Sequence, residues 1–76
     1  MNNISDVMIH VNESLSEGAR TSLENAMRKI EGVVSPGFNA GKAHLLVVTY
    51  NTETTTTAVM LETVRAAGYA AQVVGM

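Results

Sequence analysis

The sequence predicts an α+β domain with a ferredoxin-like βαββαβ fold. Two segments, residues 16–31 and 57–67, carry apolar residues at helical spacing, and four shorter segments have the apolar patterns of strands. These segments follow one another in the order of the split βαβ motif. Right-handed crossovers then give an antiparallel sheet of order 4-1-3-2 with both helices on one face. Pro36 falls on an edge strand of this arrangement, where the missing N–H is tolerated.

The first strand and first helix are predicted from residues 6–31. Residues 6–11 alternate, with their apolar side chains on one face. The helix that follows has two candidate starts, a capping box from Ser14 to Glu17 or an N-cap at Ser16. Its apolar stripe consists of Leu15, Ala19, Leu23, Ala26, Met27 and Ile30. Gly32 supplies the stop signal, so we expect the helix to run to residue 31.

Side-chain spacing predicts one ion pair on the wet side of this helix. Glu24 and Arg28 are four residues apart in the favourable order, with the acid nearer the N-terminus. We expect the pair to contribute a few tenths of a kcal/mol.

The second half of the chain is predicted as a hairpin, a helix and a last strand. Residues 33–38 form a poor edge strand, residues 39–42 a turn, and residues 43–50 a strong strand that is apolar at nearly every position. A second helical stripe consists of Thr57, Met60, Leu61, Val64 and Ala67 and stops at Gly68. Residues 71–74 form a short strand.

Composition limits the classes of function. The 76 residues fit one domain, 1–76, and the net charge is −2 with five scattered basic residues, so we expect no nucleic-acid partner. The longest apolar run is far too short to span a bilayer, and the N-terminus lacks a signal-peptide pattern, so we expect no membrane partner and a cytoplasmic protein. There is no cysteine, which removes thiolate metal sites and disulfides.

Three segment ends give the chain its resemblance to a known family. These are Lys29–Val33 at the end of the first helix, Val48–Asn51 at the end of the third strand, and Val64–Tyr69 at the end of the second helix. At this spacing the chain resembles the heavy-metal-associated domains: small copper chaperones, mercury-binding proteins and the N-terminal modules of metal-transporting ATPases. The resemblance covers residues 6–74. It implies the same fold, a bacterial-type cytosolic setting and docking on a partner protein through the first loop.

The metal motif of that family is missing from this chain. The family binds soft metal ions through a Cys-x-x-Cys pair, and the two cysteine positions fall on Ser16 and Ala19. A hydroxyl is a poor ligand for Cu(I) or Hg(II), and alanine offers none, because soft ions select thiolate or thioether. We therefore expect no cofactor at this position.

Other side chains are candidates for a different metal site. If the first and third strands are neighbours, His10 and His44 both come close to the open sheet face, with Met8 nearby. Imidazole suits copper, nickel and zinc, and oxygens of the first loop are further candidate ligands. The competing interpretation is two half-exposed surface histidines without a third ligand.

Three hypotheses for function follow. The first is a cysteine-free interaction or accessory module related to metal trafficking, which binds a protein partner or a second copy. Its partner-binding residues are those of the first loop: Asn12, Glu13, Ser14, Leu15, Ser16 and Glu17. The second is a metal-ion carrier with histidine, methionine or carboxylate ligands. The third is a dimeric small-molecule sensor. We expect no enzyme, because no nucleophile–base or acid–base pair can be placed.

Apolar residues of the third strand add one further expectation. A sheet covered on one face buries only alternate residues of Leu45 to Val48. The others are either partly covered by neighbouring side chains or form an association surface on the open face.

Overall fold

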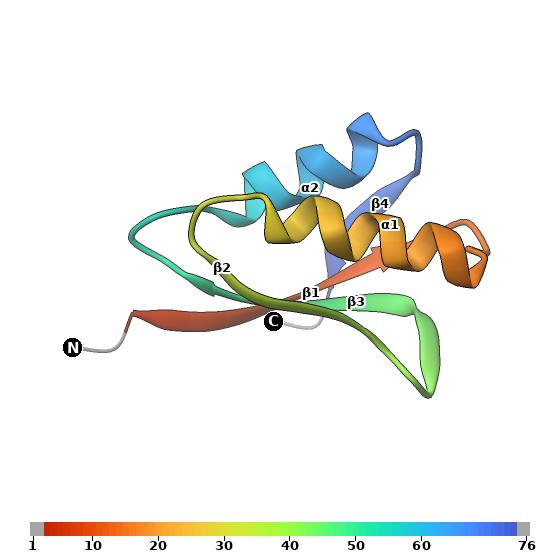
Figure 1. Cartoon of the computed structure of the whole chain (residues 1–76), viewed down its shortest axis with the longest axis horizontal. Coiled ribbons are helices and arrows are strands. Elements are labelled where there is room, and N and C mark those ends of the chain that lie inside the picture. Colours follow the sequence, from red (N-terminus) through yellow and green to blue (C-terminus); the bar gives the residue numbers. More distant parts are fainter. Residues whose placement is uncertain (1–2, 75–76) are drawn as a thin grey trace.

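The computed structural model of the chain describes residues 3–74 and confirms the predicted order of elements. The elements are β1 (Ile4–Val11), α1 (Glu17–Arg28), β2 (Val33–Asn39), β3 (Lys42–Asn51), α2 (Thr57–Ala66) and β4 (Ala71–Val74). The strands form one antiparallel sheet in the order β2-β3-β1-β4, which is the predicted order read from the other edge. Both helices cover the same face, as Figure 1 shows, and the other face is open.

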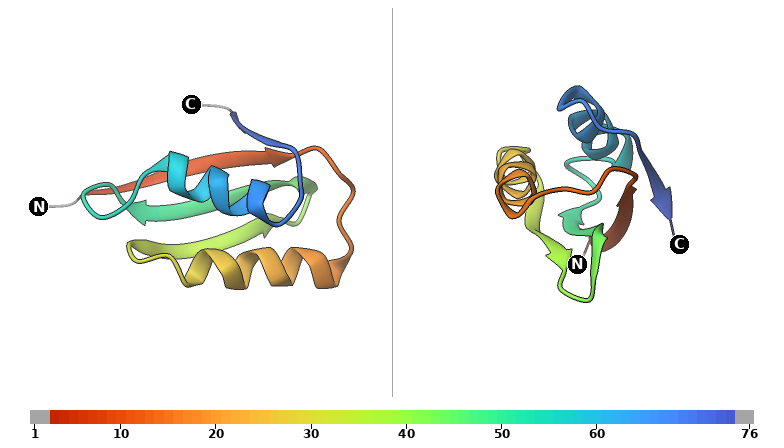
Figure 2. Two further views of the ribbon diagram at one scale, coloured as in Figure 1. Left: turned by 90° about the horizontal axis from the view of Figure 1, so that it is seen from above. Right: turned by 90° about the vertical axis from the view of Figure 1, so that its right-hand side faces the viewer.

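The register of the two central strands explains which face is buried. Val7 pairs with Val48 and Ile9 with Leu46, and all four side chains lie under the helices. The intervening pairs along β1 and β3 point to the open face because side chains alternate along a strand. The end-on view in Figure 2 shows both helices on one side of the twisted sheet.

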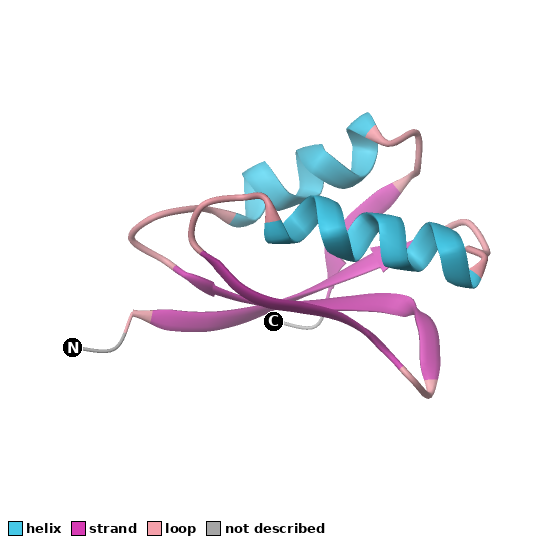
Figure 3. Cartoon of the chain, in the orientation of Figure 1, coloured by secondary structure: helices cyan, strands magenta, loops and turns pink. Residues whose placement is uncertain are grey.

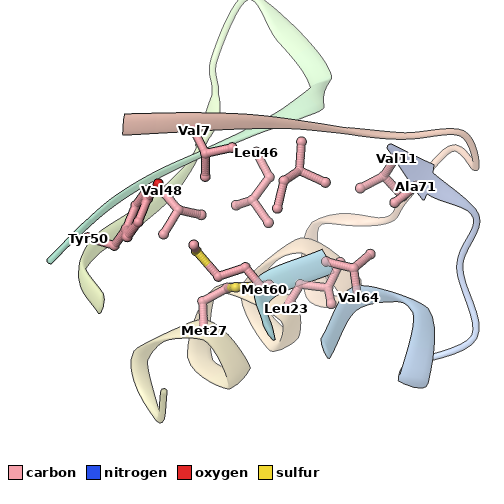
Figure 4. Close-up of a cluster of buried hydrophobic side chains, with 11 residues drawn as sticks. Val7, Val11, Leu23, Met27, Leu46, Val48, Tyr50, Met60, Val64 and Ala71 are labelled. Atoms are coloured by element: carbon pink, nitrogen blue, oxygen red, sulfur yellow. The ribbon is translucent and has the colours of Figure 1, made fainter. Parts of the chain in front are cut away.

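The core is aliphatic, with two methionines at its centre. Met27 of α1 and Met60 of α2 are fully buried and point from the helices toward the sheet (Figure 4). Both lie on the predicted helical stripes, so packing accounts for them. The buried hydrophobic set is Val7, Ile9, Val11, Leu23, Met27, Leu46, Val48, Tyr50, Met60, Val64 and Ala71.

The start and end of α1 correct the expectations in two respects. The N-cap is Ser16, so the capping box from Ser14 is wrong and the alternative start is correct. The helix ends at Arg28 rather than at residue 31. The reason is that the amides of Lys29 and Ile30 bond to carbonyls three residues back, which tightens the chain into turns before Gly32.

The expected ion pair on α1 is also wrong. Arg28 donates to Asn25 Oδ1 at 2.9 Å, while Glu24 Oε2 accepts from the backbone N–H of Phe38 at 3.0 Å. A backbone amide of the partly buried edge strand is the better partner because a carboxylate forms a charge-assisted hydrogen bond with it. Glu24 therefore connects α1 to β2.

The second half of the chain follows the prediction closely. The strand β2 lies on an edge with Pro36 in it, and a two-residue turn, Ala40 and Gly41, leads to β3. Helix α2 begins after the N-cap Thr56 and ends just before Gly68, which has a positive φ of 102°. The secondary-structure view in Figure 3 shows how short the loops between elements are. No helix among residues 3–74 is long and apolar enough to cross a membrane.

Candidate functional site

Loop one, residues 12–16, joins β1 to α1 and is hydrogen-bonded to the loop between α2 and β4. The backbone N–H of Asn12 donates to Ala70 O at 2.9 Å. The carboxylate of Glu13 accepts from the backbone N–H of Ala70, at 3.1 and 3.2 Å to its two oxygens. Loop one is therefore anchored to the connection between α2 and β4, although these segments are far apart in the sequence.

The two positions that the resemblance assigns to cysteines form a helix cap. Ser16 Oγ accepts from the backbone N–H of Ala19 at 3.1 Å, and the Ser16 carbonyl accepts from Arg20 N at 3.0 Å. A serine N-cap that satisfies an orphan amide of the first turn is the favoured arrangement at such a position. The Ser16 hydroxyl and the backbone N–H of Ala19 thus form a neutral capping hydrogen bond at the two positions that the resemblance assigns to cysteines.

The other predicted partner-binding residues differ in exposure, and Glu17 among them is the first residue of α1 rather than part of loop one. Ser14 and Glu17 are exposed, whereas Leu15 is half-buried and packs against the core. The guanidinium of Arg20 donates to Leu15 O at 2.8 Å and holds the loop against the helix. The predicted partner-binding residues therefore present backbone and polar groups, with Leu15 turned inward.

The two histidines lie together at the end of the central strands next to loop one. Their ring centroids are 5.5 Å apart and the ring planes differ by 16°. His10 Nδ1 lies 3.1 Å from Asn12 Oδ1, and His44 Nδ1 lies 2.7 Å from Val11 O. Val11 O is a backbone carbonyl that can only accept, so His44 Nδ1 donates in this hydrogen bond. The Asn12 amide has its oxygen toward His10 Nδ1, an arrangement in which that nitrogen donates.

Met8 lies on the same open face of β1 as His10, two residues earlier. It pairs across the sheet with Val47 and with Val74, so apolar neighbours surround it. Among residues 3–74, no group of three or more His, Asp or Glu side chains is placed to hold a metal ion. The structure brings the rings of His10 and His44 together.

The open sheet face carries the alternate residues of the central strands. Leu45 and Val47 of β3 are half-buried there, whereas Leu46 and Val48 are fully buried under the helices. Thr49 donates to Asp6 Oδ1 at 2.7 Å on this face. The apolar strip on the open face is thus only partly exposed.

A shallow groove between α1 and the β2–β3 turn was not predicted from the sequence. Its volume is about 270 Å³, and its lining includes Glu17, Arg20 and Thr21 of α1. Phe38, Asn39, Ala40 and Ala43 line the other side. No sequence pattern indicates this groove. Glu24, which also lines it, has the spacing of an ion-pair partner for Arg28 and was assigned to that pair.

The hydrogen bonds to the histidine rings were also missed. Asn12 follows His10 by only two residues, so a search of the sequence for nearby polar side-chain pairs could have found their contact. Val11 O, in contrast, is a backbone atom that His44 reaches from another strand. Only the register of the sheet reveals that contact.

No protein-family profile and no curated protein matches the sequence. Solved structures do match. The N-terminal domain of a potential copper-translocating P-type ATPase from Bacillus subtilis superposes with a TM-score of 0.85 at 21% identity, covering 95% of this chain and 89% of that one. Oxidized MerP from Ralstonia metallidurans CH34 gives 0.83 at 21% identity, covering 95% and 99%. The N-terminal domain of PacS from Synechocystis PCC6803 gives 0.77 at 25% identity, covering 93% and 98%.

The chain has the heavy-metal-associated fold. The resemblance noted from the segment ends is therefore confirmed for the fold, which extends over nearly the whole of this chain and of the matched chains. The donor set at the family's metal position does not fit a soft metal ion, because Ser16 and Ala19 offer one hydroxyl that already caps the helix.

Proposed function

We propose that this chain is a non-catalytic accessory module of metal trafficking that binds a partner protein through loop one. The single observation that carries the proposal is the helix cap between Ser16 and Ala19, which occupies the place of a soft-metal site. The fold is shared with domains named for copper translocation, such as the Bacillus subtilis ATPase domain. A domain that keeps this fold without the metal ligands retains its surfaces for docking.

Loop one has the properties of a preorganised docking surface. Its ends are held by the Glu13–Ala70 hydrogen bonds and by the Ser16 cap, so little conformational entropy is lost when it binds. The side chains of Asn12, Ser14 and Glu17 are exposed. The acidic residues Glu13 and Glu17 favour a partner with a basic surface, because complementary charge steers association. The cytoplasmic setting expected from the sequence is part of this proposal.

The test is a titration of the ¹⁵N-labelled chain with the N-terminal domain of a copper-transporting ATPase, followed by backbone NMR. We expect saturable shifts confined to residues 12–17 and their neighbours. Glu17→Gln weakens the interaction by removing an exposed charge, whereas Glu62→Gln, an exposed change on α2, leaves it unchanged. Shifts spread over the open sheet face, or none at millimolar partner, would contradict docking through loop one.

A second titration addresses the absence of a soft-metal site. Under anaerobic conditions, Cu(I) added to the chain produces no localised shifts at residues 12–19, because no thiolate is available there. Saturable shifts in this segment below millimolar Cu(I) would show that the module carries the metal itself.

A further inference from the structure

The histidine pair has the arrangement of two prepared metal ligands. In both His10 and His44 an oxygen is the partner of Nδ1, which leaves Nε2 as the ring atom that can bind a metal ion. A histidine that binds a metal ion almost always donates its other ring N–H to an oxygen, which fixes the tautomer and the orientation of the ring. Here Asn12 Oδ1 and Val11 O already make these two bonds.

The separation of the rings fits a shared ion. Two imidazoles bound to one ion at about 2.1 Å have ring centroids about 5 Å apart when the angle at the metal is tetrahedral. The observed separation is 5.5 Å. The rings are stacked with planes that differ by 16°, so one ring must tilt before both Nε2 lone pairs point at a shared ion.

We infer that His10 and His44 together bind one borderline divalent metal ion, of the class Zn(II), Ni(II) or Cu(II), through their Nε2 atoms. Imidazole suits these ions, and Cu(II) binds such ligands most tightly. Two protein ligands leave the remaining coordination positions to water or to an exogenous ligand. The site lies outside the Ser16–Ala19 cap, uses different donors and does not depend on the proposed docking function.

The experiment is a titration of the whole chain with Zn(II) alone, followed by long-range ¹H–¹⁵N spectra of the imidazole rings. We expect both Nε2 resonances to move together and to saturate at one ion per chain. His10→Gln then abolishes the shift of the His44 ring at the same zinc concentration. Gln72→Ala, on β4 directly opposite His10, is the matched control and leaves both shifts unchanged.

Asn12→Ala tests whether the hydrogen bond at His10 Nδ1 contributes to metal binding by the two rings. It removes the acceptor of His10 Nδ1, so the His10 ring becomes a mixture of tautomers before metal is added, and zinc affinity falls by about tenfold. Independent saturation of the two rings, or an unchanged His44 shift in His10→Gln, would overturn the inference. An absence of any ring shift at millimolar Zn(II) would overturn it as well, while loop-one docking would stand.

Discussion

At the scale of single residues, two glycines with nearly equal backbone angles have different surroundings. Gly32 and Gly68 have φ of 101° and 102°, in the left-handed region that side chains disfavour. A Cβ on Gly32 would lie 2.8 Å from Thr54 Cβ, whereas a Cβ on Gly68 would meet no atom within 4 Å. The turn after α1, which contains Gly32, therefore packs closely against the loop before α2. The turn after α2, which contains Gly68, has open space at the corresponding position.

The glycine pair yields a prediction with its own control. Gly68→Ala adds only the cost of a left-handed backbone, about 1 kcal/mol. Gly32→Ala adds that cost and a clash with Thr54, so the free energy of unfolding falls by about 2–4 kcal/mol. Urea denaturation of both variants measures the difference. Equal losses in the free energy of unfolding would mean that the loop containing Thr54 moves away from the added methyl group at no energetic cost.

The N-cap of α1 gives a second prediction at this scale. Ser16→Ala removes the acceptor for Ala19 N and lowers the free energy of unfolding by about 1 kcal/mol. Ser14→Ala changes an exposed loop hydroxyl and has an effect within about 0.5 kcal/mol. The same denaturation measurement compares them. A larger loss in Ser14→Ala would restore the capping box that the sequence also allowed.

At the scale of elements, hydrophobic patterning located all six helices and strands in the part of the chain that the structure describes, residues 3–74. The pattern succeeded because one-sided burial imposes a period of two on β1 and a helical stripe on α1 and α2. It failed at the end of α1, where the competition is between backbone hydrogen bonds of three-residue and four-residue span. Side-chain hydrophobicity carries no information on that choice, because Ile30 packs against the core from the turn.

Glu24 shows how a helix and an edge strand are joined, and it carries the third prediction. Glu24→Ala removes the acceptor for Phe38 N, so the free energy of unfolding falls by about 1.5–3 kcal/mol. Hydrogen exchange at the Phe38 amide also becomes faster, because that amide loses its partner. Glu62→Ala, on the exposed side of α2, serves as the control and stays within about 0.5 kcal/mol. An unchanged rate of hydrogen exchange at the Phe38 amide would contradict the hydrogen bond between Glu24 and Phe38.

At the scale of the whole molecule, the fold brings together residues that are far apart in the sequence. The rings of His10 and His44 meet because β1 and β3 are neighbours, and the sequence predicted that adjacency through crossover handedness. The hydrogen bond of the His44 ring could not be predicted, because its partner is the backbone oxygen of Val11, which no side-chain pattern reports. Loop one is likewise held by Ala70, more than fifty residues away in the sequence, through Glu13.

The fold also determines where a soft-metal site can be introduced, and the last prediction rests on this. Ser16→Cys combined with Ala19→Cys places two thiolates at the N-cap and the first turn of α1, where the helix N-terminus lowers thiol pKa values. The side chain at position 16 already lies over the amide of residue 19, at 3.1 Å. Ser14→Cys with Glu17→Cys has the same spacing, but its first thiol lies in the loop, two residues before the N-cap. We expect the first variant to bind Cu(I) one to one, more tightly than the second, in an anaerobic competition with a chromophoric chelator. Equal affinities would show that Cys-x-x-Cys spacing alone suffices and that the register of α1 contributes nothing.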